Sequence, residues 1–189
     1  APSLEETEER VIPDGVQALT TAAEGGVTDQ TSRSHGLLFD IRVNENTSFV
    51  SIVGMDLLVR AVYPVEYEIW TRTGSWRDDD DYEYAVFEYD PTPGDEYHLM
   101  GYTRISNGTV EGVGTSELST IPLDGFRDVK VGRGGVQAFW ITLKEDSLLL
   151  RSYEEPEGSV QETTLAQVST PDFEILYGTA VMDYPLSKE

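Results

Sequence analysis

The chain contains no cysteine. Without thiols it can form no disulfide, zinc–thiolate site or iron–sulfur cluster, and it has no thiol nucleophile. Packing of apolar side chains must therefore hold the fold. The 189 residues are enough for one domain of generous size with a real core.

Histidine is scarce, and only His35 and His98 are present. A Ser-His-Asp triad needs a positioned histidine, and a histidine metal site usually needs two or three ligands. The sequence also has no Gly-x-Ser-x-Gly elbow and no phosphate-binding glycine loop before a helix. The absence of these catalytic residues and motifs predicts a protein that is not an enzyme. Glycosidase chemistry stays open, because it needs only two carboxylates and the chain has 35 acidic residues.

Basic residues are few: 13 Lys and Arg stand against 35 Asp and Glu, which gives a net charge of −22. Such a charge repels nucleic-acid phosphates and anionic membrane surfaces, so no nucleic-acid partner is expected. It suits divalent cations, basic partners or solubility in a salty medium. No apolar run approaches the length of a membrane span, and no membrane insertion is expected. The acidic start, residues 1–6, has no signal-peptide pattern, which fits a mature product whose leader was removed.

Alternation of apolar and polar residues begins after His35. In the clearest run Val65, Tyr67 and Ile69 face inward, while Glu66 and Glu68 face outward. Further strands are expected over 37–43, 49–58, 82–89, 96–105, 115–121, 127–131, 136–143, 147–153 and 173–181, with a hairpin turn at Asn107-Gly108. About ten short strands without a convincing helix between them predict an all-β, antiparallel β-sandwich of jelly-roll-like form.

The composition divides the chain into three parts. Residues 1–34 form a polar extension, which we expect to be partly helical or extended, with a capping-box pattern favouring a helix over 4–11. Residues 35–182 form the sandwich domain, with an acidic and aromatic insert at 77–99, and residues 183–189 form a tail. An ordered polar extension has to pack against something, so the extension is read as an arm for self-association.

A series of strand and turn motifs runs through residues 36–180. It comprises Gly36-x-x-Phe39-Asp40, Val53-Gly54-Met55-Asp56, Tyr67-Glu68-Ile69-Trp70-Thr71-Arg72-x-Gly74-Ser75-Trp76, Gly112-x-Gly114-Thr115, Val129-x-Val131-Gly132, Ala138-Phe139-Trp140-Ile141-Thr142 and Phe173-Glu174-Ile175-x-x-Gly178. The series resembles a β-rich domain of unknown function that recurs in predicted secreted or surface proteins of diatoms and related algae. The resemblance implies an extracellular or cell-surface location and transfers no functional residues.

The first residues suggest a second location. Ala1-Pro2-Ser3 resembles what remains after an algal plastid leader is cut at a Phe before Ala-Pro. An acidic structural protein of an algal plastid is therefore the alternative.

The insert opens with four consecutive aspartates, Asp78, Asp79, Asp80 and Asp81. Calcium takes six to eight oxygen ligands, so this run is the candidate metal site. The alternating spacing of an EF-hand is missing, and adjacent side chains diverge. The other interpretation is a solvated, self-repelling loop, and no other cofactor is expected.

Aromatic residues gather around the same insert. The candidates for ligand or interface contacts are Trp70, Trp76, Tyr82, Tyr84 and Tyr97. Trp70 shares the outward face with Glu66 and Glu68. Its ring would stack on a sugar, anchor a protein interface, or lie covered by a second sheet or by the extension.

Two sequons make Asn46 and Asn107 the glycosylation candidates. Both lie in turn-like contexts, and both are compatible with secretion. The function expected from the whole sequence is a structural or adhesive module that works by protein–protein assembly. The alternative is carbohydrate binding, with a calcium-dependent form as its variant.

Overall fold

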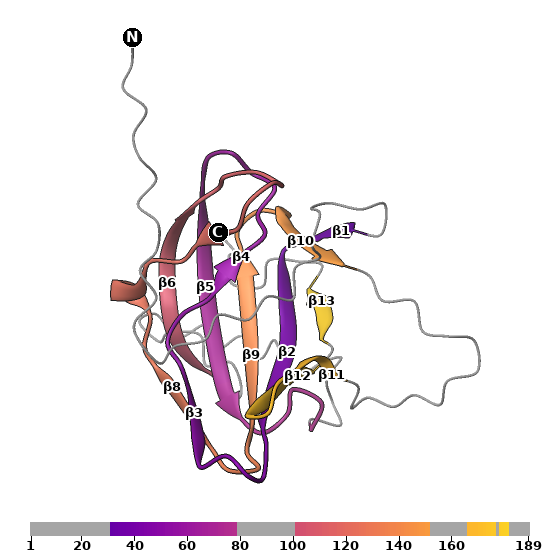
Figure 1. The fold of residues 1–189 in the computed structure, drawn as a ribbon. Helices are drawn as coiled ribbons and strands as arrows, with labels where there is room; N and C mark the ends of the chain where they lie inside the picture. The colour runs from indigo at the N-terminus through magenta and orange to yellow at the C-terminus, as the bar shows by residue number, and fades with distance from the viewer. Residues whose placement is uncertain (1–30, 79–100, 152–165, 177, 182–189) are drawn as a thin grey trace, which may run out of the picture.

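The computed structural model describes residues 31–78, 101–151, 166–176 and 178–181 (Figure 1). Its elements are β1 (Thr31–Ser34), β2 (Gly36–Val43), β3 (Phe49–Ile52), β4 (Asp56–Leu57), β5 (Pro64–Thr73), β6 (Thr103–Glu111), β7 (Ser119–Thr120), the short helix η1 (Leu123–Gly125), β8 (Val129–Gly132), β9 (Val136–Leu143), β10 (Leu148–Arg151), β11 (Ala166–Ser169), β12 (Phe173–Leu176) and β13 (Thr179–Val181). The ladders between these strands are antiparallel. The predicted all-β, antiparallel sandwich is confirmed.

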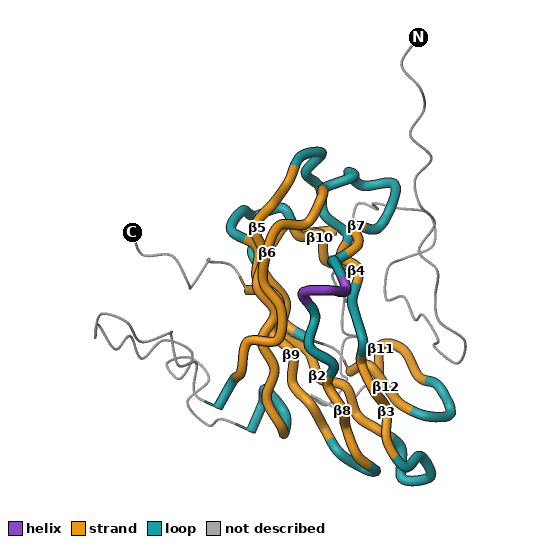
Figure 2. Tube along the Cα trace, turned by 90° about the vertical axis from the view of Figure 1, so that its left-hand side faces the viewer, coloured by secondary structure: helices purple, strands orange, loops and turns teal. Residues whose placement is uncertain are grey.

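One large sheet forms the first layer. Its strand order is β11-β12-β2-β9-β5-β6, and β13 pairs with β2 beyond the end of β12. The pairs β3–β8 and β4–β7 stand opposite this sheet and form the second layer (Figure 2). In the described part of the chain β6 is an end strand of the large sheet.

The main core lies between the two layers. Val65, Tyr67 and Ile69 of β5 point into it as predicted, and each is at most 2% exposed. Phe39 of β2 and Phe139 of β9 stack there with ring centroids 5.6 Å apart. Alternation on the central strands therefore sets which face meets the second layer.

The opposite face of the large sheet carries a second apolar cluster. Leu38, Trp70 and Trp140 form it, and each is at most 5% exposed. Partly buried Trp76 and Tyr102 pack against these three residues. The central strands are consequently buried on both faces.

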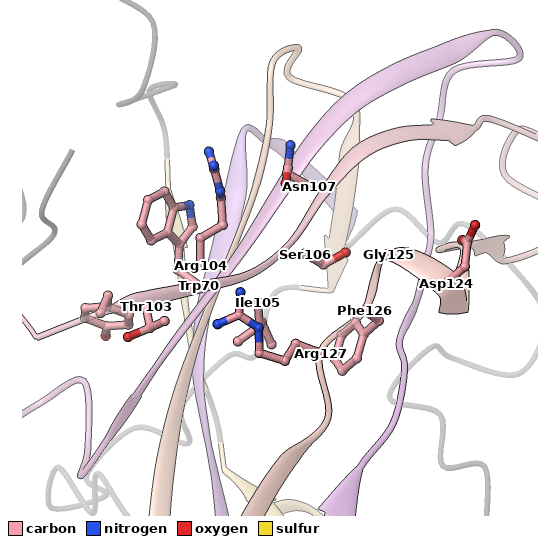
Figure 3. A pocket seen from close by; sticks show the side chains of 11 residues that line it. Trp70, Thr103, Arg104, Ile105, Ser106, Asn107, Asp124, Gly125, Phe126 and Arg127 are labelled. Atoms are coloured by element: carbon pink, nitrogen blue, oxygen red, sulfur yellow. The ribbon is translucent and has the colours of Figure 1, made fainter. Parts of the chain in front are cut away.

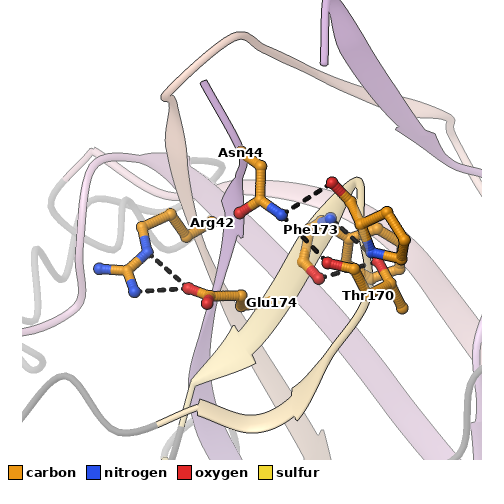
Figure 4. Close-up of polar contacts among 6 residues, drawn as sticks. Arg42, Asn44, Thr170, Phe173 and Glu174 are labelled. Atoms are coloured by element: carbon orange, nitrogen blue, oxygen red, sulfur yellow. Dashed lines mark hydrogen bonds and ion pairs between the residues drawn. The ribbon is translucent and has the colours of Figure 1, made fainter. Parts of the chain in front are cut away.

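Polar contacts fix the C-terminal strands to β2. The guanidinium of Arg42 donates hydrogen bonds to the Glu174 carboxylate across the β2–β12 ladder (Figure 4). Past the end of β2, the Asn44 side-chain amide donates to the carbonyls of Thr170 and Pro171, each at 3.0 Å (Figure 4). These bonds hold the turn between β11 and β12 against the end of β2.

One turn prediction is wrong. Asn107 and Gly108 do not form a hairpin, since they lie inside β6 and pair with Glu68 and Tyr67 of β5. The Asn-Gly pair favours a hairpin turn only when no neighbouring strand is available for hydrogen-bonded pairing. Here β5 runs on past both residues, and pairing with it overrides the local preference.

The boundary of the extension also needs correction. Residues 31–34, placed in the extension, form β1 and pair with β10. Ser34 is 1% exposed, and its hydroxyl accepts the Gly36 N–H at 3.1 Å. The sandwich therefore includes at least four residues before His35.

Several strand boundaries differ from the predicted ones. The strand expected over 49–58 is divided into β3 and β4, and that expected over 115–121 is reduced to the two residues of β7. The helix expected over 4–11 and the strand over 82–89 lie outside the described residues. None of the helices in the described ranges has the length and apolarity needed to cross a membrane.

Candidate functional site

A groove of about 540 Å³ runs beside β6 (Figure 3). Trp70 and residues 102–107 form one side, and residues 124–127 form the other. The first side belongs to the end of the large sheet, and the second to η1 and the segment that follows it. The groove thus lies along the outer border of a strand.

A break in the strand register shapes this groove. The pairing of β5 with β6 shifts between Ile69 and Trp70, so Ile105 has no opposite residue in the ladder. The Ile105 carbonyl instead accepts the Arg127 N–H at 2.9 Å. Neighbouring Phe126 is 7% exposed and belongs to the main core. Together these contacts fix the segment after η1 beside the strand.

The groove carries charges of both signs, with Arg104 and Arg127 on its lining beside the exposed acid Asp124. Arg104 forms an ion pair with Glu68 at 3.2 Å, and its guanidinium lies 5.6 Å from the centroid of the Trp70 ring. Arg127 is exposed and forms no ion pair within the described residues. An open positive charge is notable in a chain whose net charge is −22, because it offers a local site for an anionic group.

Glu68 lies among these groups and is only partly exposed. Burial is the main cause that raises its pKa. Hydrogen bonds from Trp70 Nε1 at 3.2 Å and from Arg104 lower the pKa in the opposite sense. The carboxylate thus orients both Trp70 and Arg104 at the groove.

The predicted aromatic candidates have different environments. Trp70 is 5% exposed, so its ring is covered and is not an open stacking platform. Trp76 is half-buried, and the Arg77 guanidinium lies 4.3 Å from the centroid of its ring. Three further candidates lie outside the described residues: Tyr82, Tyr84 and Tyr97.

Tyr102 lines the groove and was not among the predicted residues. Its ring meets Trp140 edge-on with centroids 6.3 Å apart, and Arg72 lies 5.1 Å from its centroid. The sequence does contain a signal for it, since Tyr102 and Arg104 alternate within one expected strand.

The turn after β5 is fixed by buried Asp40. Its carboxylate accepts the Ser75 hydroxyl and the Trp76 N–H, the latter at 3.1 Å. Burial is the main cause that raises the pKa of Asp40. Asp78 accepts the Ser75 N–H at 2.8 Å, so the first residue of the predicted calcium site stabilises the same turn.

The structure brings together no calcium-type cluster in its described part. No group of three or more His, Cys, Asp or Glu residues there could hold a metal ion. Asp79, Asp80 and Asp81 lie outside that part, so the calcium prediction remains untested.

Both sequon residues, Asn46 and Asn107, are exposed, and Asn107 lines the groove.

Two carboxylates with raised pKa values, Asp40 and Glu68, share one face of the large sheet. Asp40 lies opposite Ala138 of β9, and Glu68 lies opposite Thr142. This register separates them by about 13 Å along the strands and about 10 Å across two strand spacings. Glycosidase pairs need carboxylates about 5–10 Å apart, so these two do not form one.

Half-buried His35 lies with Nδ1 3.3 Å from the Leu143 carbonyl, and His98 is outside the described residues.

No protein-family model matches the chain, and no curated protein or solved structure matches it. The likeness to the algal β-rich domain therefore stays an expectation drawn from the residues. The groove and strand β6 are the features from which a function can be inferred.

Proposed function

We propose that the chain is a non-enzymatic β-sandwich module that acts by protein–protein assembly through the border of β6. The observation that carries this proposal is an exposed end strand beside a groove with an open arginine. Asn107, Gly108 and Thr109 are exposed, and no described strand pairs with their outer side. An unpaired strand border of this kind is a template for pairing with another polypeptide.

The polar N-terminal segment belongs to the same proposal as an assembly arm. Residues 1–30 contain seven acidic residues, Glu5, Glu6, Glu8, Glu9, Asp14, Glu24 and Asp29, and a single basic one, Arg10. An acidic segment is complementary to the exposed guanidinium of Arg127 at the groove. A cell-surface location, as the algal resemblance implies, suits such a module, and a structural role in a plastid would use the same surfaces.

Light scattering after size exclusion tests the proposal on the full chain. We expect the mass to rise above the 21.0 kDa of one chain as the protein concentration is increased at neutral pH. Parallel runs with calcium and with a chelator show whether the ion takes part. A mass of one chain at every concentration, with and without calcium, contradicts self-assembly.

Carbohydrate binding is the second candidate, and the lining of the groove favours it. Tyr102 offers an aromatic ring, while Ser106 and Asn107 offer hydroxyl and amide groups for sugar hydroxyls. Affinity electrophoresis in gels containing neutral or acidic polysaccharides tests this role. Retardation that is lost in Asn107→Ala supports the groove, and retardation lost in Trp76→Ala supports the turn. Unchanged mobility in every gel contradicts the carbohydrate role.

A further inference from the structure

We infer that the partner of β6 is a second copy of this chain, with the two β6 strands paired antiparallel about a twofold axis. The inference rests on the proposed assembly function and identifies its interface. Three properties of β6 support it: the direction of its backbone groups, the absence of a blocking residue, and the distribution of charge along it.

The direction of the backbone groups follows from one hydrogen bond. The Glu66 carbonyl of β5 accepts the Lys144 N–H at 3.0 Å, so the backbone groups of Glu66 point toward β9. Residues alternate in an antiparallel strand, and Tyr67 must therefore point its groups toward β6. Its partner there is Gly108, whose groups point back toward β5.

The same alternation turns the neighbours of Gly108 the other way. Asn107, Thr109 and Glu111 point their N–H and C=O groups away from the sheet. All three are exposed, and none has a hydrogen-bond partner within the described residues. Toward the other end of β6 the outward carbonyl of Ile105 is already bonded to Arg127, which closes the border at that point. Among the described residues, nothing pairs with the outer side of β6 over residues 106–111.

In the part of the chain that the structure describes, this stretch lacks the features that usually protect a strand border. Proteins blunt such borders with proline, lysine, bulges or covering segments. From Ser106 to Val110 the strand has no proline and no charged side chain. The register shift and the covering segment that the structure describes lie at the Ile105 end.

The charges on β6 make the strand complementary to itself. Arg104 and Arg127 lie at one end of this stretch, and Glu111 lies at the other. Antiparallel pairing of two copies brings Glu111 of each copy toward the arginines of the other. Twofold symmetry produces this contact twice. Glu111 and Arg127 form no ion pair within their own chain in the described part, so both are available.

Thr109→Pro tests the backbone contact. It removes an outward N–H and no bond to β5, and an end strand accepts proline at such a position. We expect the full chain with this change to stay at 21.0 kDa where the unmodified chain doubles its mass, with an unchanged circular dichroism spectrum. Thr109→Val keeps the N–H and is the matched control, which we expect to dimerise normally.

A charge exchange tests the pairing direction. Glu111→Lys or Arg127→Glu alone should weaken the dimer about tenfold, because each change replaces two attractions by two repulsions. The double variant restores opposite charges at both places and should recover the dimer. Measurements at about 0.15 M salt keep the repulsion between two acidic chains screened beyond about 8 Å.

The outcomes separate the interface from the function. Assembly that persists in Thr109→Pro overturns the β6 interface and leaves the assembly function standing. The β6 interface is also overturned if the single charge variants leave the dimer affinity unchanged, or if the double variant dimerises more weakly than either single variant. Deletion of residues 1–30, which leaves β1 in place, would then test the arm. A chain that is monomeric at every concentration overturns both the interface and the assembly function.

Discussion

The carboxylate of Asp40, on β2, accepts the backbone N–H of Trp76 at 3.1 Å. Asp40 is 1% exposed, and the Ser75 hydroxyl donates to its other oxygen. A buried acid thus joins the central strand to the turn that follows β5. Burial raises the pKa of Asp40 despite these two hydrogen bonds.

Asp40 should give the protein a measurable dependence of stability on pH. The folded chain holds the Asp40 proton more tightly than the unfolded chain, so its contribution to stability is full below the ordinary pKa of 3.8. That contribution is lost as the pH rises through the raised pKa. We therefore expect the unfolding free energy of the unmodified chain to fall, relative to that of Asp40→Asn, as the pH is raised above the ordinary pKa of 3.8. Urea unfolding of both proteins across this range measures it, and a constant difference would contradict the prediction.

The ion pair at the groove should control the ionisation of Glu68. Arg104 lowers the pKa of this carboxyl against the effect of burial, so Arg104→Leu should raise the pKa further. Carbon-13 NMR titration of labelled glutamate carboxyls measures the change. Lys144→Leu is the control. The Lys144 ammonium lies 3.7 Å from the carboxylate of Glu66, which is on the same strand as Glu68. An equal rise of the Glu68 pKa in both variants would argue against a direct effect. The loss of stability in Arg104→Leu should stay within about 1 kcal/mol, since the pair is partly exposed.

The stacked pair in the main core should be costly to disrupt. Phe139 is fully buried against Phe39, and Phe139→Ala should lower the unfolding free energy by about 3–5 kcal/mol. Leu123, also apolar, is 44% exposed on η1, so Leu123→Ala should change it by no more than about 0.5 kcal/mol. Chemical unfolding provides both values. Similar losses in the two variants would show that the core is placed wrongly.

The turn between β8 and β9 should depend on one of its glycines. Gly134 has a φ of 64°, in the left-handed region that costs other residues about 1–2 kcal/mol. Gly134→Ala should lower the unfolding free energy by that amount. Gly132, the last residue of β8, has no positive φ and open space where a Cβ would lie, so Gly132→Ala should have little effect. Thermal unfolding of the two variants distinguishes the positions, and an equal loss in both would contradict this assignment.

Alternation predicted the strands with the clearest inward faces. The expected strand over 136–143 coincides with β9, and Val65, Tyr67 and Ile69 face the core as expected. The second apolar cluster was not predicted, although β9 contains its signal. Ala138 and Trp140 are apolar residues on the face that alternation assigns to solvent, and such a continuous run is typical of a strand buried on both sides.

The groove depended on features that no local pattern reports. It is formed by the register shift at Ile69 and by the bond from Arg127 to Ile105, which joins residues far apart in the chain. The turn statistics of Asn107-Gly108 pointed the other way, toward a hairpin. Only the pairing of β6 with β5 shows that these residues lie, exposed, inside an end strand.

The pairing of β2 with the C-terminal strands has a consequence for how the chain is made. Ile41 pairs with Ile175, and Leu38 pairs with Thr179, so β2 pairs with strands that follow it far along the chain. During synthesis one flank of this strand has no native partner until residues 173–181 have been made. Long-range closure of this kind slows folding, and it leaves an early, hydrophobic strand in need of protection from other nascent chains.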